Sequence, residues 1–364
     1  MSATQNRLQR LRLKMRENGV GLVAIGPGPH MSWLLGFHPH PDERPCLLLI
    51  GREQEIFLMP ILNAAGTREH TDIDFVTWSD EDGPSEAIVT ALKAINASAP
   101  GSLVLDETMR ADFAFLVVDA LPSDTRRDFT GNTLGALRLI KDEVEFELLK
   151  MNAAIADRAM QRAFGCIRAG MSEKQLAAEI CEHFTSEGAV PSFWIVGTGG
   201  NSAFPHHSAG ERVIEQGDAV VIDIGAVKQG YPSDITRMAV VGEGPDGYAE
   251  IHAIVEEAVQ AAMAAARPGA VAREVDAAAR KVITAAGYGE YFTHRTGHGM
   301  GVEGHEPPYL TAASDTVLQT GMVFSIEPGI YLPGKFGVRL EEIVYLTADG
   351  PEILSDLGRS TFRF

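Results

Sequence analysis

Hydrophobic residues recur with two different periods along the first 130 residues of the chain. Leu8, Leu11 and Met15 stand at helical spacing among basic side chains, which predicts an amphipathic helix near the start. Helical patterns also occur near 84–97 and 110–121. Short apolar runs that predict strands lie at 22–25, 46–50, 55–59, 74–78 and 102–106. This mixture of strands and helices predicts a small α/β domain.

The pattern changes near residue 135, where turn residues give way to a long helical stretch. Its apolar stripe is predicted to consist of Val144, Leu148, Met151 and Ile155. A chain of 364 residues also exceeds the length that a single core usually supports. The sequence therefore predicts two domains, residues 1–135 and residues 136–364.

An internal repeat organises the second domain. Residues 168–188 align without gaps with 267–287 at an offset of 99, and both segments are predicted to be helices. Downstream, residues 217–225 align with 321–329 at an offset of 104. We therefore expect two copies of a helix-plus-hairpin unit, packed about a pseudo-twofold axis.

Acidic residues occupy matched positions in the two copies. Asp223 aligns with Glu327, and the next strand carries Asp234 in the first copy and either Glu341 or Glu342 in the second. Carboxylates that converge in an apolar sheet repel one another, so cations usually hold them together. Two divalent ions would offset four carboxylates, and one imidazole could complete an oxygen-rich shell that suits manganese, cobalt, iron or zinc. A pair of ions can share a hydroxide that attacks a carbonyl, so the pattern predicts a hydrolase.

The glycine-rich segment 294–308 offers three histidines as candidates for the imidazole ligand. His294 and His298 are four residues apart, but their glycine-rich surroundings disfavour a helix and no glutamate follows the first, so the helical zinc motif fails. Glycines beside His298 allow a close approach to a metal. His294 and His305 are better placed to contact substrate or a tetrahedral intermediate.

Composition narrows the range of partners and compartments. Thirty-one basic against 49 acidic residues give a net charge of −18, which disfavours nucleic acid and anionic membranes as partners. Three widely spaced cysteines form no Cys-x-x-Cys pair, so neither a disulfide framework nor a thiolate metal site is predicted. The sequence shows no signal-peptide pattern and no apolar run long enough to span a membrane, so we expect a cytoplasmic protein without a membrane partner.

Six segments carry a resemblance to a known family: "GNSAFPHH", "VVIDIG", "YPSDITR", "HRTGHGMGVEGHEPP", "FSIEPGIY" and "GVRLEE". In order and spacing they resemble the signature segments of the pita-bread metallopeptidases, and most closely those of Xaa-Pro dipeptidases (prolidases) and Xaa-Pro aminopeptidases. The resemblance covers essentially all of residues 135–364. It implies a pita-bread domain with a pseudo-twofold repeat, preceded by a small α/β domain of creatinase type, and a homodimer.

The resemblance also implies which residues act. The metal ligands would be Asp223, Asp234, His298, Glu327 and Glu341, which selects Glu341 over Glu342. His206, rather than the adjacent His207, and His305 would contact the substrate near the scissile bond, and His294 would assist the tetrahedral intermediate.

Two further roles follow from position relative to these ligands. Glu327 is the candidate proton shuttle, because a metal-bound carboxylate beside the attacking hydroxide is within reach of the departing amine. Arg339 precedes Glu341 by two residues and therefore shares its strand face, so it is expected to orient the carboxylates.

One feature departs from the family pattern. Typical prolidases carry an arginine soon after the "HE" motif that binds the carboxylate of the dipeptide, whereas this chain has "HEPPYL". We hypothesise that Arg44, in the segment "HPHPDERP", supplies the missing contact in the same or a partner subunit.

The resulting prediction is hydrolysis of an Xaa-Pro dipeptide or short peptide with two divalent ions per chain, manganese first, cobalt or zinc as alternatives. An Xaa-Pro aminopeptidase acting on longer peptides is the nearest alternative. A metal-dependent C–N hydrolase of the creatinase or ectoine-hydrolase kind is another. A non-catalytic binding module should show decayed ligands, yet all five are present.

Overall fold

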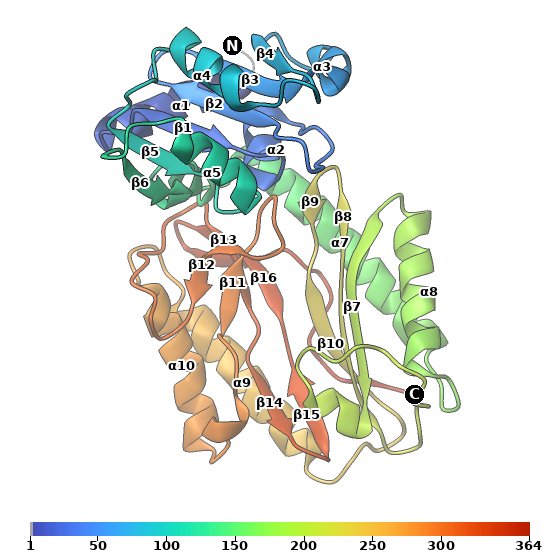
Figure 1. Cartoon of the computed structure of the whole chain (residues 1–364). Coiled ribbons are helices and arrows are strands. Elements are labelled where there is room, and N and C mark those ends of the chain that lie inside the picture. Colours follow the sequence, from blue (N-terminus) through green and yellow to red (C-terminus); the bar gives the residue numbers. More distant parts are fainter. Residues whose placement is uncertain (1–2) are drawn as a thin grey trace. The chain divides into compact units, whose positions relative to one another are not determined.

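The computed structural model describes residues 3–364, which form two compact units, one ending at Arg138 and the other spanning Leu139–Phe364. Figure 1 colours the chain from the first unit in blue and green to the second in green through red. Among residues 3–364, no helix combines the length and the apolar character that crossing a membrane requires.

The first unit is built on a six-stranded mixed sheet with the order β4-β3-β2-β1-β5-β6. Its strands are β1 (Leu22–Ile25), β2 (Leu47–Gly51), β3 (Glu55–Pro60), β4 (Phe75–Trp78), β5 (Ser102–Leu105) and β6 (Arg126–Phe129). Its helices are α1 (Ala3–Glu17), α2 (Pro29–Leu35), α3 (Ile61–Arg68), α4 (Ser85–Ala94), α5 (Ala111–Asp119), the 3-10 turn η1 (Thr130–Asn132) and α6 (Leu134–Arg138). Helices α4 and α5 pack on the sheet through a core that includes Ile88, Leu92 and Phe113.

Every strand and helix that the sequence predicted in this unit is present, and Leu8, Leu11 and Met15 are buried as expected. Five short elements were missed: β6, α2, α3, the 3-10 turn η1 and α6. Strand β6 is exposed at every position and three of its four residues are charged, so it shows no alternating apolar pattern; it is an edge strand that pairs in parallel with β5. Helices α2 and α3, with 7 and 8 residues, are shorter than the window of about 11–18 residues in which a helical pattern can be recognised.

The second unit contains two larger sheets and two pairs of helices. The first sheet consists of β7 (Val190–Thr198), β8 (Ala219–Lys228), β9 (Tyr231–Pro232), β10 (Ile235–Val240) and β18 (Phe362–Arg363). The second consists of β11 (Gly297–Gly299), β12 (Glu306–Leu310), β13 (Val323–Ile326), β16 (Glu342–Thr347) and β17 (Gly350–Ile353). A separate hairpin joins β14 (Gly329–Leu332) to β15 (Phe336–Arg339), and two 3-10 turns, η2 (Gly199–Ala203) and η3 (Gly289–Tyr291), lie in connections.

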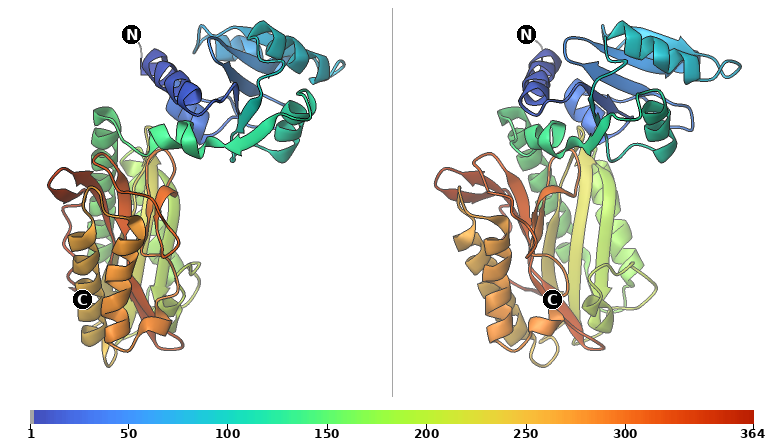
Figure 2. Two further views of the ribbon diagram at one scale, coloured as in Figure 1. Left: turned by 90° about the vertical axis from the view of Figure 1, so that its left-hand side faces the viewer. Right: turned by 60° about the vertical axis from the view of Figure 1, so that its left-hand side comes forward.

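Helices cover the outer faces of these two sheets, as Figures 1 and 2 show. Helices α7 (Glu143–Cys166) and α8 (Glu173–Ser186) pack on the β8–β10 sheet through a core that includes Met160, Ile180 and Ile222. Helices α9 (Tyr248–Ala265) and α10 (Ala272–Ala285) pack against the β13–β16 sheet through a core that includes Val259 and Phe324.

The two halves of this unit repeat the same local structure. Helices α8 and α10 are displaced by 99 residues at both ends, and each is followed by an antiparallel pair, β8–β10 or β13–β16. A backbone hydrogen bond to the segment before each helix is also repeated. Ile214 N donates to Met171 O before α8, and Leu318 N donates to Ala270 O before α10, both at 2.8 Å. This matching bears out the helix-plus-hairpin repeat inferred from the sequence.

The apolar stripe predicted for helix α7 is only partly correct. Ile155 is buried and Leu148 and Met151 are half-buried, but Val144 is 66% exposed, and the buried face also includes Leu149, Ala156 and Met160. The prediction missed part of the buried face because it counted only large apolar residues, whereas Ala156, Ala159 and Ala163 pack in the same core as Ile155 and Met160.

Candidate metal centre

A cavity of about 570 Å³ lies within the second unit and gathers most of the predicted site residues. Its lining consists of Phe193, Ile195, Pro205, His206, Asp223, Asp234, His294, Arg295, His298, His305, Glu327, Arg339 and Glu341. Of the candidates named from the sequence, Arg44, which belongs to the first unit, lies outside this lining, as do His207 and Glu342, the alternatives to His206 and Glu341.

The four carboxylates come from equivalent places in the two halves. Asp223 lies in β8 and Glu327 directly follows β13, while Asp234 and Glu341 directly precede β10 and β16. Asp223, Asp234 and Glu341 are buried and can bring one oxygen each within 4.8 Å of the others, and His298, Glu327 and Glu341 form a second such group. The internal repeat therefore converges on one cluster.

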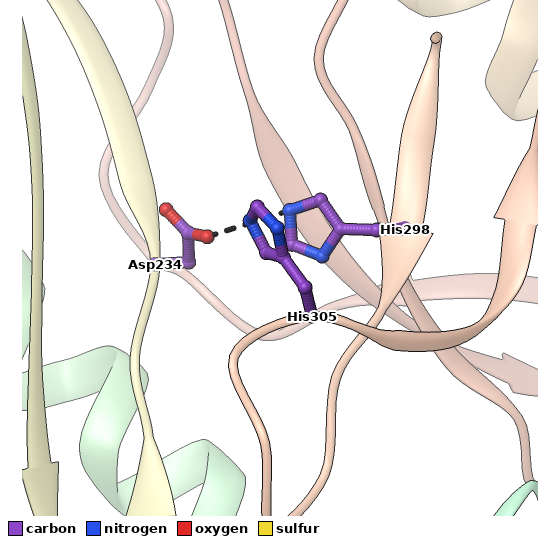
Figure 3. A group of neighbouring side chains, drawn as sticks. All are labelled: Asp234, His298 and His305. Atoms are coloured by element: carbon purple, nitrogen blue, oxygen red, sulfur yellow. Dashed lines mark ion pairs between the residues drawn. The ribbon is translucent and has the colours of Figure 1, made fainter. Parts of the chain in front are cut away.

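His298 faces this cluster with its Nε2 atom. The Nδ1 atom lies 3.1 Å from the carbonyl oxygen of Gly299, and because a carbonyl can only accept, Nδ1 carries the hydrogen. Nε2 lies 3.2 Å from Glu327 Oε1 and 3.6 Å from Asp234 Oδ2, the second contact being visible in Figure 3. A lone pair cannot face two carboxylates without a proton or a cation between them.

The carboxylates do not titrate alike. Burial, followed by the neighbouring Glu341 and Asp223, raises the pKa of Asp234 well above its ordinary value. Burial and the charges of Glu327 and Asp223 do the same to the pKa of Glu341. Burial also acts to raise the pKa of Glu327, but a His298 ring protonated at both nitrogens outweighs it through its hydrogen bond and charge and brings that pKa to about 2.

These residues fit divalent cations. Asp223 Oδ1 is buried and has no hydrogen-bond partner within residues 3–364, which is costly for a carboxylate oxygen unless a ligand binds it. Carboxylate oxygens with one imidazole form a hard, oxygen-rich donor set. The pKa values of Asp234 and Glu341 are raised because no cation offsets the negative charge of the neighbouring buried carboxylates.

Arg339 lies beside the cluster and is buried. Its Nη2 donates to Asp223 Oδ2 at 2.5 Å, its Nε to Thr236 Oγ1 at 3.2 Å, and its Nη1 to the hydroxyl of Tyr331 at 2.7 Å. Thr236 in turn donates to Glu341 Oε2 at 2.8 Å. Arg339 thus contacts Asp223 directly and Glu341 through Thr236, and it leaves Asp223 Oδ1 free to bind a cation.

His206 and His207 differ clearly in their surroundings. His206 is exposed and lines the cavity, whereas His207 Nε2 lies 2.7 Å from the buried carboxylate of Glu173 at the start of α8. Glu173 also accepts from Thr198 N at 2.9 Å and Asn201 Nδ2 at 3.0 Å, so it ties down the loop that carries His206.

His294 has both ring nitrogens engaged. Nδ1 donates to the carbonyl oxygen of Arg295 at 2.7 Å, and Nε2 lies 2.7 Å from the hydroxyl of Tyr331. Burial lowers the pKa of His294 to about 4 and raises that of Tyr331 to about 12, so Tyr331 donates to a neutral ring. Any direct action of His294 on a reaction intermediate would require it to exchange this partner.

His305 packs directly on the metal-facing histidine. The centroids of the His305 and His298 rings are 3.8 Å apart, and Figure 3 shows His305 reaching the cluster from its own loop. Its Nδ1 lies 3.1 Å from Arg295 Nη2. Burial, with smaller contributions from His298 and Arg295, lowers the pKa of His305 to about 4.

Two acidic or basic candidates have partners of their own. Glu342 Oε1 accepts from Arg237 Nη2 at 3.0 Å and Arg359 Nη1 at 2.8 Å, and it does not line the cavity. Arg44 forms a bidentate pair with Asp80, with Nε to Oδ1 at 2.9 Å and Nη2 to Oδ2 at 3.0 Å.

The sequence reasoning missed Arg295, Thr236, Tyr331 and Ser325. Ser325 Oγ accepts from His298 N at 2.9 Å and donates to Glu327 Oε1 at 3.0 Å, linking two candidate ligands. Thr236 and Ser325 each lie two residues from a candidate ligand, so strand alternation could have found them.

A buried set of carboxylates and one imidazole, open to a cavity, defines a divalent-metal enzyme. The chain belongs to metallopeptidase family M24, whose family model matches residues 147–348, and the model of the creatinase/prolidase N-terminal domain matches residues 7–140. The family resemblance, the pita-bread fold and the creatinase-type first domain expected from the sequence are thereby confirmed.

Three relatives illustrate how far the similarity extends. The Xaa-Pro dipeptidase of Lactobacillus delbrueckii subsp. lactis is 36% identical over 94% of this chain and 95% of its own length. The structure of a recombinant prolidase from Thermococcus sibiricus superposes with a TM-score of 0.92 at 35% identity, covering 100% of both chains. That of dipeptidase PepE from Mycobacterium ulcerans gives 0.94 at 33% identity, over 100% of this chain and 98% of the other.

Proposed function

We propose that this protein is an Xaa-Pro dipeptidase that works with two divalent ions per chain, manganese first and cobalt or zinc as alternatives. The ions would be held by Asp223, Asp234, His298, Glu327 and Glu341. The observation that carries the proposal is the convergence of these five side chains, with an orphan oxygen on Asp223, on one cavity. Relatives of the same length that are called Xaa-Pro dipeptidases supply the substrate class.

When bound, such ions would activate a water molecule and stabilise the charge that develops on the attacked carbonyl. The residues of the chain would supply positioning and proton transfer. Glu327 would carry the proton from the water to the departing amine, because its oxygen faces the cluster beside His298. Arg339 would keep Asp223 oriented, and His206 and His305 would contact the substrate from the cavity wall.

The apolar part of the cavity suits a proline ring. Phe193 and Ile195 of β7, together with Pro205, line the same cavity as the charged cluster. Proline has no backbone N–H, so strand-like recognition of the peptide fails and the ring itself has to be bound. An apolar wall beside the metal ligands would provide that recognition.

The test uses protein stripped of metal with a chelator and then reloaded with manganese. Proline release from an Xaa-Pro dipeptide is measured beside cleavage of an Xaa-Pro-Xaa tripeptide, and the stripped protein is the control. We expect cleavage of the dipeptide only, restored by the metal. Cleavage chiefly of the tripeptide would make the protein an Xaa-Pro aminopeptidase, and bound metal without cleavage of either would favour another C–N hydrolase.

Arg44 remains our candidate for the carboxylate contact that the "HEPPYL" segment lacks. Its bidentate pair with Asp80 would have to open for this role, at the cost of two charge-assisted hydrogen bonds. We expect Arg44→Ala to lower the ratio of dipeptide to tripeptide turnover, with Arg110→Ala, another arginine of the first unit paired with an aspartate, as the control. An unchanged ratio would remove Arg44 from the site.

We also propose that the protein is a cytoplasmic homodimer, as the family resemblance implies. Light scattering on the purified holoenzyme would give twice the chain mass of 39.2 kDa if this is right, and a single chain mass if it is wrong.

A further inference from the structure

The three histidines of segment 294–308 differ in the partner of one ring nitrogen. In a neutral imidazole one nitrogen carries the hydrogen and the other offers a lone pair, and the partner of either nitrogen decides which. His294 and His298 each place Nδ1 against a backbone carbonyl, at 2.7 and 3.1 Å. A carbonyl only accepts, so in both rings Nδ1 carries the hydrogen and Nε2 has the lone pair.

His305 has the opposite arrangement. Its Nδ1 lies 3.1 Å from Nη2 of Arg295, and a guanidinium can only donate. Nδ1 must therefore hold the lone pair, and the hydrogen of the neutral ring must be on Nε2. The ring packs against His298 at a tilt of 42° and lines the cavity, so this places a hydrogen-bond donor beside the candidate metal cluster.

We infer that Arg295 is a positioning residue that fixes His305 in the Nε2–H tautomer, so that His305 acts as a hydrogen-bond donor to the substrate and not as a metal ligand. One residue then sets two histidines in opposite senses: its backbone carbonyl fixes His294 and its side chain fixes His305. The inference that this donor serves turnover rests on the proposed function. The tautomer itself does not.

Arg295 is held firmly enough for this task. Its guanidinium carbon lies 4.5 Å from the centre of the Tyr309 ring, a cation–π contact that restrains a half-buried side chain. The preceding residue is restrained as well, because the carbonyl oxygens of His294 and Phe292 both accept from Arg280 of α10. Arg280 is in turn paired with buried Asp276 at 2.8 Å.

A competing interpretation would make His305 a ligand. One ligand atom each of Asp234, His298 and His305 lies within 4.8 Å of the others. Figure 3 shows the three side chains gathered at one place. Binding a metal through Nε2 would require the hydrogen to move to Nδ1, where it would point at the guanidinium of Arg295. The contact with Arg295 therefore opposes metal binding by His305.

The first experiment reads the tautomer directly. Long-range proton–nitrogen correlation spectra of the zinc-loaded full-length protein distinguish ring nitrogens with and without hydrogen, and His305→Gln identifies the His305 signals. We expect Nε2 to carry the hydrogen in the wild type and in Arg295→Lys, which keeps a donor. In Arg295→Met, which keeps much of the length without a donor, we expect a shift toward the Nδ1–H form. A wild-type ring with hydrogen on Nδ1, or an unchanged ring in Arg295→Met, would overturn the inference.

The second experiment separates positioning from general structural support. Glutamine at position 305 can present an amide N–H near the place of Nε2 and has no tautomers. We expect Arg295→Met to lower kcat for the Xaa-Pro dipeptide by about 10- to 100-fold in the His305 background, as for loss of an oriented donor. In the His305→Gln background, Arg295→Met should change kcat by no more than about twofold. In the chain that keeps His305, Arg295→Lys should retain most of the wild-type kcat.

Equal losses in both backgrounds would mean that Arg295 acts through structure alone, which would overturn the inference. If no Xaa-Pro substrate is cleaved at all, the proposed function fails, yet the spectra still decide the tautomer. The two failures can thus be told apart.

Discussion

At the scale of single residues, adjacent positions with the same chemistry take different roles. Glu341 and Glu342 follow one another, and strand geometry sends them to opposite faces. Glu341 accepts from Thr236 and lines the cavity, while Glu342 is locked between Arg237 and Arg359. His206 and His207 separate in the same way, one toward the cavity and one toward Glu173.

This contrast makes the two glutamates a matched pair for mutation. Glu341→Gln should lower metal affinity by at least about 100-fold, because even residues that only support a ligand cost up to that much. Glu342→Gln should keep the metal but lower the free energy of unfolding by about 1–3 kcal/mol, since the buried guanidinium of Arg237 and the half-buried one of Arg359 lose a charged acceptor. Metal content after dialysis measures the first effect, and unfolding in denaturant measures the second. Loss of metal from Glu342→Gln would contradict the assignment of Glu341 rather than Glu342 as the ligand.

At the scale of elements, the two halves of the second unit are joined by buried arginines. Arg237 of β10 has no exposed side-chain surface and donates to the backbone of Thr236 at 3.0 Å and of Glu341 at 2.5 Å, as well as to Glu342. Arg339 of β15 makes the reverse connection to Asp223 of β8. The candidate metal ligands of one half are therefore supported by arginines of the other.

We expect Arg237→Met to lower the free energy of unfolding by about 3–5 kcal/mol, because it leaves the buried Glu342 short of a charged partner. Arg363→Met is the matched control: Arg363 lies in neighbouring β18, and its contacts with Gly242 O and Glu243 O are exposed. Its effect should stay within about 0.5 kcal/mol. Equal effects in chemical denaturation would show that Arg237 is not the support inferred from its burial.

At the scale of the whole molecule, metal binding and stability are linked through the carboxylate cluster. Asp234 and Glu341 have raised pKa values in the metal-free fold, so the folded chain keeps protons that the unfolded chain has released. The contribution of these groups to stability is therefore present below the ordinary carboxyl range and is lost as pH rises through their raised pKa values. Divalent ions bind the deprotonated carboxylates, so the stabilisation of the fold by bound metal increases as pH rises.

The difference in Tm between manganese-loaded and metal-free protein should therefore grow as pH rises from about 5 to about 8. Thermal unfolding at each pH with and without manganese measures this difference, and Asp234→Asn should flatten its pH dependence. A difference that shrinks with rising pH would contradict the directions of these pKa shifts.

Most of the α/β architecture could be predicted from the sequence because the strands are short apolar runs and the repeat preserves its spacing. The repeat predicted that Asp223 and Glu327 are equivalent, and the structure brings both to one cavity. Prediction failed where packing outweighs pattern, as on α7, where alanines are buried while Val144 is exposed. It also failed at β6, which is a strand only because β5 pairs with it.

By itself, the sequence determined most of the longer elements, the family, and the set of acidic and imidazole side chains that could bind cations, because these depend on local periodicity and residue chemistry. Only the tertiary structure decided which neighbours those side chains have. Thr236 and Arg339 are 103 residues apart yet lie 3.2 Å from each other, and Arg295 reaches His305 across a loop. Strand pairing and sheet packing create these contacts, and hydrogen-bond partners, pKa values and tautomers depend on them rather than on order along the chain.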